Sequence, residues 1–170
     1  MLVHRLSLKD NIKDIKEKLI GECLTQRRFE ENSGNFKLDT IYLNKLYDLF
    51  ISSAKKCLNK FTLNDNNFEI WCCITDKKFN ITDWHNHRYT STVNAVLYLD
   101  TQDKWIDFRY DNNEVYIKPN NDDMLIFPGS LDHRLHPSVD KERISLNLEI
   151  RCKENENKLF KIWRKKKILK

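Results

Sequence analysis

The chain has 170 residues, 40% of them hydrophobic and 32% charged, which predicts one globular domain with a core of its own. Its five cysteines are irregularly spaced and include no CxxC pair, which argues against a disulfide framework and favours reduced thiols in a cytoplasmic protein. The net charge is +5, and no apolar run is long enough for a signal peptide or a membrane span, so no membrane partner is expected.

The first part of the chain, residues 1–62, is predicted to be helical. A helix is expected to start at Ser7, because "SLKD" fits the [ST]-x-x-[DE] start pattern. An apolar stripe follows at helical spacing, formed by Leu8, Ile12, Ile15 and Leu19. A longer helix is predicted over residues 40–58, where apolar side chains again lie along one face.

From residue 68 the hydrophobic period changes to two, which is typical of strands. The predicted strands are 68–75, 92–99, 104–110, 114–118, 123–127 and 143–151. Helices followed by many short strands favour a mainly β sandwich or barrel with helices outside it. We expect a β core over residues 68–152, followed by a basic tail over 153–170, all within one domain. The chain contains no GxGxxG or Walker A motif, which argues against a nucleotide-binding α/β fold.

Two histidines, His85 and His87, stand one residue apart in "DWHNHRYT". Residues at i and i+2 of an extended segment project to the same side, so both imidazoles could bind one metal ion. A third ligand would have to come from His4, His133 or His136. An HxH pair alone is also typical of solvated loops, so the interpretation depends on the residues that follow.

The polar face of the last strand begins at Arg143 and includes Ser145, ten and twelve residues after His133. This order resembles the HxD…H…RxS pattern of iron(II)- and 2-oxoglutarate-dependent oxygenases. The segments "STVNAVLYLD" and "YIKPNNDDMLIFPGSLDHRLHPSVDKERISLNL" are similar to segments of prolyl-hydroxylase-like members. The likeness is closest to small bacterial and phage-type oxygenases, whose metal pair often reads HxH. It covers residues 32–150 and is strongest over 83–150.

The resemblance implies a double-stranded β-helix (a jelly roll, cupin-like) with the N-terminal helices packed on one sheet. It implies a hydroxylase that uses iron(II), 2-oxoglutarate and dioxygen. The metal ligands that it implies are His85, His87 and His133. It further implies that Arg143 and Ser145 hold the distal carboxylate of 2-oxoglutarate, since arginine forks onto carboxylates. Lesser contacts are expected from Tyr98, Asn94 and Asn147.

The chain departs from the family pattern at His87, where most members have a carboxylate. Iron sites of this kind usually have two histidines and one carboxylate, so three neutral imidazoles leave the metal one unit more positive. One alternative is that Asp83, water or chloride fills this position. Another is a three-histidine, cupin-like metalloenzyme that does not use 2-oxoglutarate. Asp122 also stands where many relatives have a glycine, which we interpret as drift.

A third class of function is a non-enzymatic β-sandwich that binds a partner through its basic tail. Six of the ten residues in 161–170 are Lys or Arg, and such a cluster can bind an anionic partner such as nucleic acid. We favour a solvated terminal helix instead, because no nucleic-acid-binding motif accompanies the charge. No motif in the sequence identifies the primary substrate.

Overall fold

The computed structural model describes residues 3–30, 34–57, 68–79, 82–102, 104–111, 113–136 and 141–151. The helices are α1 (Lys9–Ile12), α2 (Lys16–Phe29) and α3 (Leu43–Cys57). The strands are β1 (His4–Ser7), β2 (Asn35–Lys37), β3 (Phe68–Thr75), β4 (Val93–Asp100), β5 (Ile106–Tyr110), β6 (Asn113–Ile117), β7 (Asp123–Pro128), β8 (Asp132–Leu135) and β9 (Arg143–Ile150).

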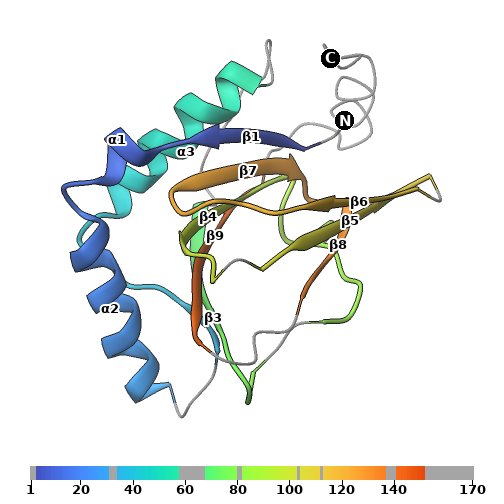
Figure 1. Ribbon diagram of the computed structural model, residues 1–170. Coiled ribbons are helices and arrows are strands. Elements are labelled where there is room, and N and C mark those ends of the chain that lie inside the picture. The colour runs from blue at the N-terminus through green and yellow to red at the C-terminus, as the bar shows by residue number, and fades with distance from the viewer. Residues whose placement is uncertain are drawn as a thin grey trace.

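These strands form two antiparallel sheets (Figure 1). The larger sheet has the order β1-β7-β4-β9-β3-β2, and the smaller sheet has the order β6-β5-β8. The aromatic rings of Phe108 in β5 and Phe127 in β7 meet across the gap, with 5.0 Å between their centroids. Sequentially distant strands thus alternate between two facing sheets, as in a jelly roll. The predicted fold class is confirmed.

The helices lie on the outer side of the larger sheet, away from the smaller one (Figure 1). The stripe predicted from the sequence is buried there: Leu8, Ile12, Ile15 and Leu19. Leu46 and Phe50 of α3 are fully buried as well. The apolar face of β9, led by Ile144 and Leu146, is buried on this side, so the polar face of β9 is turned toward the smaller sheet.

The N-terminus differs from the single helix that was predicted to start at Ser7. His4–Ser7 form β1, which pairs with β7, and Nη2 of Arg5 lies 2.5 Å from Oδ2 of Asp123. Ser7 therefore ends a strand, and α1 begins at Lys9 without a side-chain cap. Pairing with a strand more than a hundred residues away overrides the local helix signal.

The predicted strands of the core agree with the structure to within two residues at each end, and β3 agrees at both ends. β2 and β8 were missed, because they span only three and four residues and carry no clear alternation. The basic segment 161–170, and the end of the predicted helix at Leu58, lie outside the described residues. Of the helices that the structure does describe, none has both the length and the apolar character needed to cross a membrane.

Candidate metal centre and cosubstrate pocket

Three imidazoles from distant parts of the chain converge between the two sheets. His85 and His87 lie in the loop before β4, and His133 lies in β8. One ligand atom from each residue lies within 4.8 Å of the other two. The ring centroids are 4.3 Å apart for His85 and His133 and 5.2 Å apart for His87 and His133. His136 is excluded from this group, because its Nε2 is 2.7 Å from Oδ1 of Asp107.

The backbone holds these histidines in register. His85 and His133 form an isolated bridge in which each N–H donates to the carbonyl of the other, at 3.0 and 2.9 Å. The N–H of His87 donates to the carbonyl of Gly129 at 2.7 Å, in the turn between β7 and β8. The loop therefore continues the smaller sheet, which positions the imidazoles before any metal binds.

Hydrogen bonds at Nδ1 orient all three imidazole rings. Nδ1 of His85 lies 3.0 Å from the Asp83 carbonyl, and Nδ1 of His133 lies 3.0 Å from the Leu131 carbonyl. Nδ1 of His87 lies 2.9 Å from Oε1 of Glu149. Carbonyl and carboxylate oxygens accept hydrogen bonds, so each Nδ1 carries the proton. In the neutral form of the ring, Nε2 is then the nitrogen with the lone pair that a metal needs.

Burial keeps two of these imidazoles neutral. His133 is only 4% exposed, and burial, together with the nearby His85, lowers its pKa from 6.5 to about 3. Burial also lowers the pKa of His85, against the opposing effect of its hydrogen bond to the Asp83 carbonyl. Neutral imidazole is the form that ligates metals, so these residues are ready to bind without first losing a proton.

A carboxylate stands next to the triad without being part of it. Glu149 lies on the polar face of β9, and its side chain is 7% exposed. Its Oε1 lies near Nδ1 of His87 and accepts a second hydrogen bond from Nδ2 of Asn147 at 2.9 Å. Asp83, the alternative ligand considered from the sequence, contributes a backbone carbonyl and lies on the surface. Glu149 was not predicted, because its contact with His87 depends on how the loop folds over β9.

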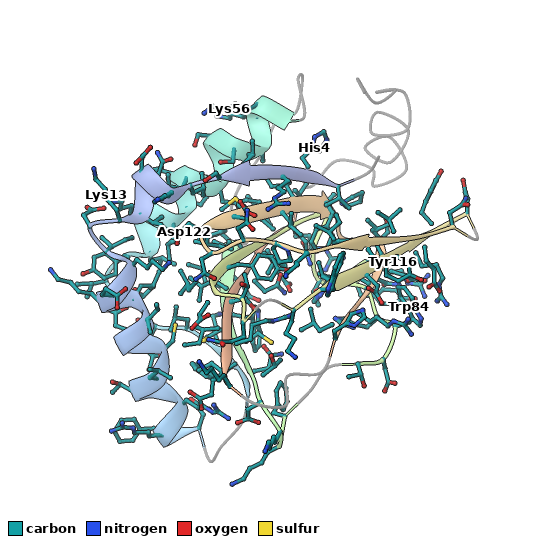
Figure 2. The ribbon with its side chains drawn as sticks, in the orientation of Figure 1. His4, Lys13, Lys56, Trp84, Tyr116 and Asp122 are labelled. Carbon is teal, nitrogen blue, oxygen red and sulfur yellow. The ribbon has the colours of Figure 1, made fainter. Side chains whose placement is uncertain are left out.

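The side chain of Trp84 packs the loop that carries His85 and His87, here called the histidine loop, against the outer face of the smaller sheet. Two guanidinium groups contact its ring, with the guanidinium carbons of Arg109 and Arg134 at 4.6 Å and 4.5 Å from the ring centroid. Nδ2 of the neighbouring Asn86 donates to Oδ1 of Asp132 at 2.7 Å. Figure 2 shows Trp84 on the same side of the molecule as Tyr116 of β6, far from α2. These contacts hold the residues on either side of His85 in place.

A cavity of about 290 Å³ opens beside the triad. Its lining consists of Asn35, Cys73, His85, His87, Val96, Ile106, His133, Leu135, Ser145 and Asn147. The larger sheet contributes Asn35, Cys73, Val96, Ser145 and Asn147, whereas the smaller sheet contributes Ile106, His133 and Leu135. A partly apolar cavity with a few convergent polar groups is typical of a small-molecule site.

Arg143 lies on the same face of β9 as Ser145 and Asn147 and is fully buried. Within the described part of the chain, its Nε and Nη2 have no hydrogen-bond partner, and its Nη1 lies 3.5 Å from the Trp105 carbonyl. Its guanidinium carbon lies 5.7 Å from the centroid of the Tyr98 ring. A buried guanidinium requires an anion or several acceptors, so this position favours a negatively charged ligand.

Further unpartnered polar atoms surround Arg143. Thr75 in β3 is its direct cross-strand partner, and the buried Oγ1 of Thr75 has no hydrogen-bond partner among the residues that the structure describes. Tyr98 in β4 pairs with Ser145, and no described residue hydrogen-bonds to its buried hydroxyl. The Ser145 hydroxyl donates to the Cys73 carbonyl at 3.5 Å, a long contact. Thr75 was not predicted, although the β3–β9 register identifies it once those strands are paired.

The two asparagines that were expected to make lesser contacts also lie on this face. Asn94 in β4 is opposite Glu149, and neither Oδ1 nor Nδ2 of its buried amide has a hydrogen-bond partner in the described ranges of the chain. Asn147 lines the cavity, and no described residue donates to its Oδ1. The structure thus gathers all five residues expected at the cosubstrate on the inner face of the larger sheet.

Comparison with solved structures places this arrangement in a known fold. The chain is similar to a prolyl-4-hydroxylase from Pseudomonas putida, with a TM-score of 0.66, 18% identity, and coverage of 90% of this chain and 94% of that one. It is similar to a prolyl hydroxylase from Trichoplax adhaerens, solved in complex with a hypoxia inducible factor oxygen degradation domain peptide fragment. That match has a TM-score of 0.64 and 17% identity and covers 93% of this chain and 86% of the other.

A third similar structure is the viral collagen prolyl hydroxylase of Paramecium Bursaria Chlorella virus-1. Its TM-score is 0.58 at 14% identity, with 91% of each chain covered. No family model matches the chain. No curated protein matches it by sequence. The resemblance predicted from the sequence is therefore confirmed as one of fold: the chain has the jelly roll of the 2-oxoglutarate oxygenases.

Proposed function

We propose that this protein is an iron(II)- and 2-oxoglutarate-dependent oxygenase that hydroxylates its substrate. One observation carries the proposal. Three imidazoles converge inside the jelly roll, and the inner face of the same fold also carries the buried guanidinium of Arg143, which requires an anion. A histidine cluster or a buried arginine alone is compatible with several kinds of protein. Together they are what a site needs to hold a metal ion and a dicarboxylate side by side.

The metal would be held by His85, His87 and His133. Imidazole ligands suit iron(II), and three of them on one side leave other coordination positions open. When bound, iron(II) and 2-oxoglutarate would supply, with dioxygen as the oxidant, the chemistry that couples decarboxylation of the cosubstrate to succinate and CO2 with hydroxylation of a C–H bond. The protein's contribution is to fix the rings through their Nδ1 hydrogen bonds and to line the space beside them with apolar residues such as Ile106 and Leu135.

The unpartnered groups around Arg143 fit the distal carboxylate of 2-oxoglutarate. Arg143 would supply Nε and Nη2, and the hydroxyls of Tyr98 and Thr75 would add two more donors. Ser145 lies on the same face of β9, two residues after Arg143 and in the lining of the cavity, and would contribute its hydroxyl. Asn94 and Asn147 lie further along toward Glu149 and would contact the metal-proximal end of the cosubstrate or the substrate.

A second candidate is a three-histidine metalloenzyme that does not use 2-oxoglutarate. The observation in its favour is the triad itself, which contains no carboxylate. This alternative does not explain the buried Arg143, because the Nε and Nη2 of Arg143 would then lack a hydrogen-bond acceptor. We therefore rank it second.

Anaerobic titration with iron(II), with and without 2-oxoglutarate, followed by visible absorbance, tests the proposal. A weak charge-transfer band is expected only when both are present. It should disappear in His133→Ala, and in Arg143→Gln the 2-oxoglutarate concentration needed for half of the band should rise at least tenfold. Arg88→Gln is the matched control, since it removes the same charge from an exposed side chain of the histidine loop.

The outcomes separate the candidates. Iron binding without any response to 2-oxoglutarate would favour the three-histidine alternative. Absence of iron binding in the wild-type protein would overturn both. An equal loss in Arg88→Gln and Arg143→Gln would point to overall charge rather than to a carboxylate site at Arg143.

A further inference from the structure

We propose that Glu149 supplies the carboxylate of this metal centre. It would not bind the metal directly but would act through its hydrogen bond to the imidazole of His87. The inference rests on the proposed function, because it concerns the metal that the triad would hold. It makes Glu149 a positioning residue that also supplies the negative charge missing from the triad.

Glu149 contacts the His87 ring at its Nδ1 edge. Oε1 of Glu149 is 2.9 Å from Nδ1 of His87, so the carboxylate engages the side of the ring opposite to Nε2. The same oxygen accepts a hydrogen bond from Nδ2 of Asn147 at 2.9 Å. Two donors converge on one oxygen, which identifies that oxygen as an acceptor and the N–H of His87 as a donor. A carboxylate behind a ligating imidazole fixes the orientation of the ring and makes it a stronger ligand.

Glu149 is also a buried carboxylate. The Glu149 side chain is 7% exposed and lies on β9, in the middle of the larger sheet. Its cross-strand neighbours are Glu69 in β3 and Asn94 in β4, and neither is a cation. Among the described residues, the only side chain that can form an ion pair with Glu149 is His87, and only when its imidazole is protonated. With His87 neutral, a buried carboxylate is unfavourable unless something positive binds nearby. A metal ion on the far side of His87 would provide that charge.

Glu149 also balances the overall charge of the loaded site. The two positive charges of iron(II) match the two negative charges of 2-oxoglutarate. Arg143 then contributes one positive charge on the inner face, and Glu149 contributes one negative charge on the same face of the same strand. The site is therefore neutral overall, as a site with a directly ligating carboxylate and no Glu149 would be. His87 and Glu149 together replace a direct carboxylate ligand.

This role predicts opposite effects on the metal-free and metal-bound protein. In Glu149→Gln, the amide oxygen can still accept from both His87 and Asn147, so only the charge is removed. Metal affinity should fall, because partners behind a ligand typically account for about 10- to 100-fold in affinity. The stability of the metal-free protein should stay the same or rise, because a buried charge has been neutralised.

The test uses the full-length protein and cobalt(II), whose visible ligand-field bands report both affinity and geometry. The dissociation constant is measured for the wild type, Glu149→Gln and Glu69→Gln, together with the melting temperature of each metal-free protein. Glu69 is the matched control: it faces Glu149 across the β3–β9 pair, but its side chain is 42% exposed and pairs with Lys37. Glu69→Gln should bind cobalt(II) like the wild type.

The inference is supported if Glu149→Gln weakens cobalt(II) binding at least tenfold and shifts the ligand-field bands, without a lower melting temperature for the metal-free protein. Affinity within twofold of the wild type would overturn it while leaving the metal site intact. A parallel loss of affinity and metal-free stability would also overturn it, because Glu149 would then be structural. If the wild type bound neither cobalt(II) nor iron(II), the proposed function itself would fail.

Discussion

His85 and His133 belong to segments far apart in sequence, yet each donates its backbone N–H to the carbonyl of the other, at 3.0 and 2.9 Å. Their rings lie 4.3 Å apart. The triad is therefore an extension of the smaller sheet, and its geometry is set by strand pairing rather than by a bound ion. A site built in this way has little conformational entropy left to lose when a ligand binds.

The first prediction concerns stabilisation by metal. Because the imidazoles already converge, cobalt(II) at about 100 times its dissociation constant should stabilise the folded protein by roughly 3 kcal/mol. For a chain of this size, that raises the melting temperature by about 5 to 10 °C. Thermal unfolding with and without cobalt(II) measures the shift. His85→Ala should abolish it, whereas His136→Gln should retain it, since His136 pairs with Asp107 outside the triad.

The second prediction concerns pH. The unfolded chain protonates a histidine below about pH 6.5, whereas folded His133, whose pKa is lowered to about 3, stays neutral. The unfolded state thus binds more protons in this window, and stability must fall as the pH drops from about 6.5 toward 3. For the metal-free protein, His133 alone should remove about 2 kcal/mol between pH 7 and pH 5.

Urea unfolding at these two pH values measures that loss. In His133→Gln, which cannot titrate, the decrease should be smaller by about the same amount. An identical decrease in the variant would mean that other groups cause the acid sensitivity.

Most of the β core could be predicted from the sequence because alternation along a strand is a local property. The face of β9 that carries Arg143, Ser145 and Asn147 follows directly from the period of two. The pairing of β1 with β7, and the short β8, could not be predicted, because their hydrogen-bond partners are distant in sequence. Thr75 and Glu149 were not recognised for the same reason. The role of each depends on a contact with a residue from another part of the chain, Arg143 for Thr75 and His87 for Glu149.

Asp122 shows that a departure from a family pattern can carry structural information. It adopts a left-handed conformation with φ of 69°, which explains why a glycine would suit this position. Its Oδ1 lies 2.6 Å from Nζ of Lys16 in α2, so the aspartate adds an ion pair that glycine could not. Our interpretation of Asp122 as drift missed this contact, because the sequence does not show that α2 ends up beside the turn.

The third prediction concerns Gly129, whose carbonyl accepts the N–H of His87. A Cβ at this position would lie 2.0 Å from the Ser91 carbonyl oxygen, so the turn would have to move. Gly129→Ala should destabilise the protein by about 1–3 kcal/mol and weaken cobalt(II) binding. Gly21→Ala is the matched control, because a Cβ there meets nothing within 4 Å and should stabilise α2 by about 0.5–1 kcal/mol. Urea unfolding and cobalt(II) titration of both variants measure these effects.

The fourth prediction concerns the attachment of the histidine loop. Trp84→Ala removes two cation–π contacts, with Arg109 and Arg134, and should cost about 1–2 kcal/mol of stability. Cobalt(II) affinity should fall as well, because Trp84 directly precedes His85. Tyr89→Ala serves as the control, since that side chain is in the same loop but is 74% exposed. Equal metal affinity in Trp84→Ala and the wild type would show that the backbone bridge alone holds the loop.

The last prediction separates ligand binding from stability at Tyr98. Its hydroxyl is buried without a partner, and burial raises its pKa, so it remains a neutral donor. Tyr98→Phe removes an unsatisfied group and should stabilise the ligand-free protein by about 1 kcal/mol.

If the hydroxyl binds the distal carboxylate of 2-oxoglutarate, the same change should weaken cosubstrate binding by roughly three- to tenfold. Urea unfolding and 2-oxoglutarate titration of the iron(II) protein measure the two effects. Tyr116→Phe, which alters an exposed hydroxyl bonded to Glu114, should change neither. Stabilisation without loss of affinity would remove Tyr98 from the cosubstrate site and leave Arg143 and Thr75 as its donors. Higher stability of the ligand-free protein together with weaker 2-oxoglutarate binding would mean that the Tyr98 hydroxyl serves to bind the cosubstrate. Its presence would then lower the stability of the protein when no ligand is bound.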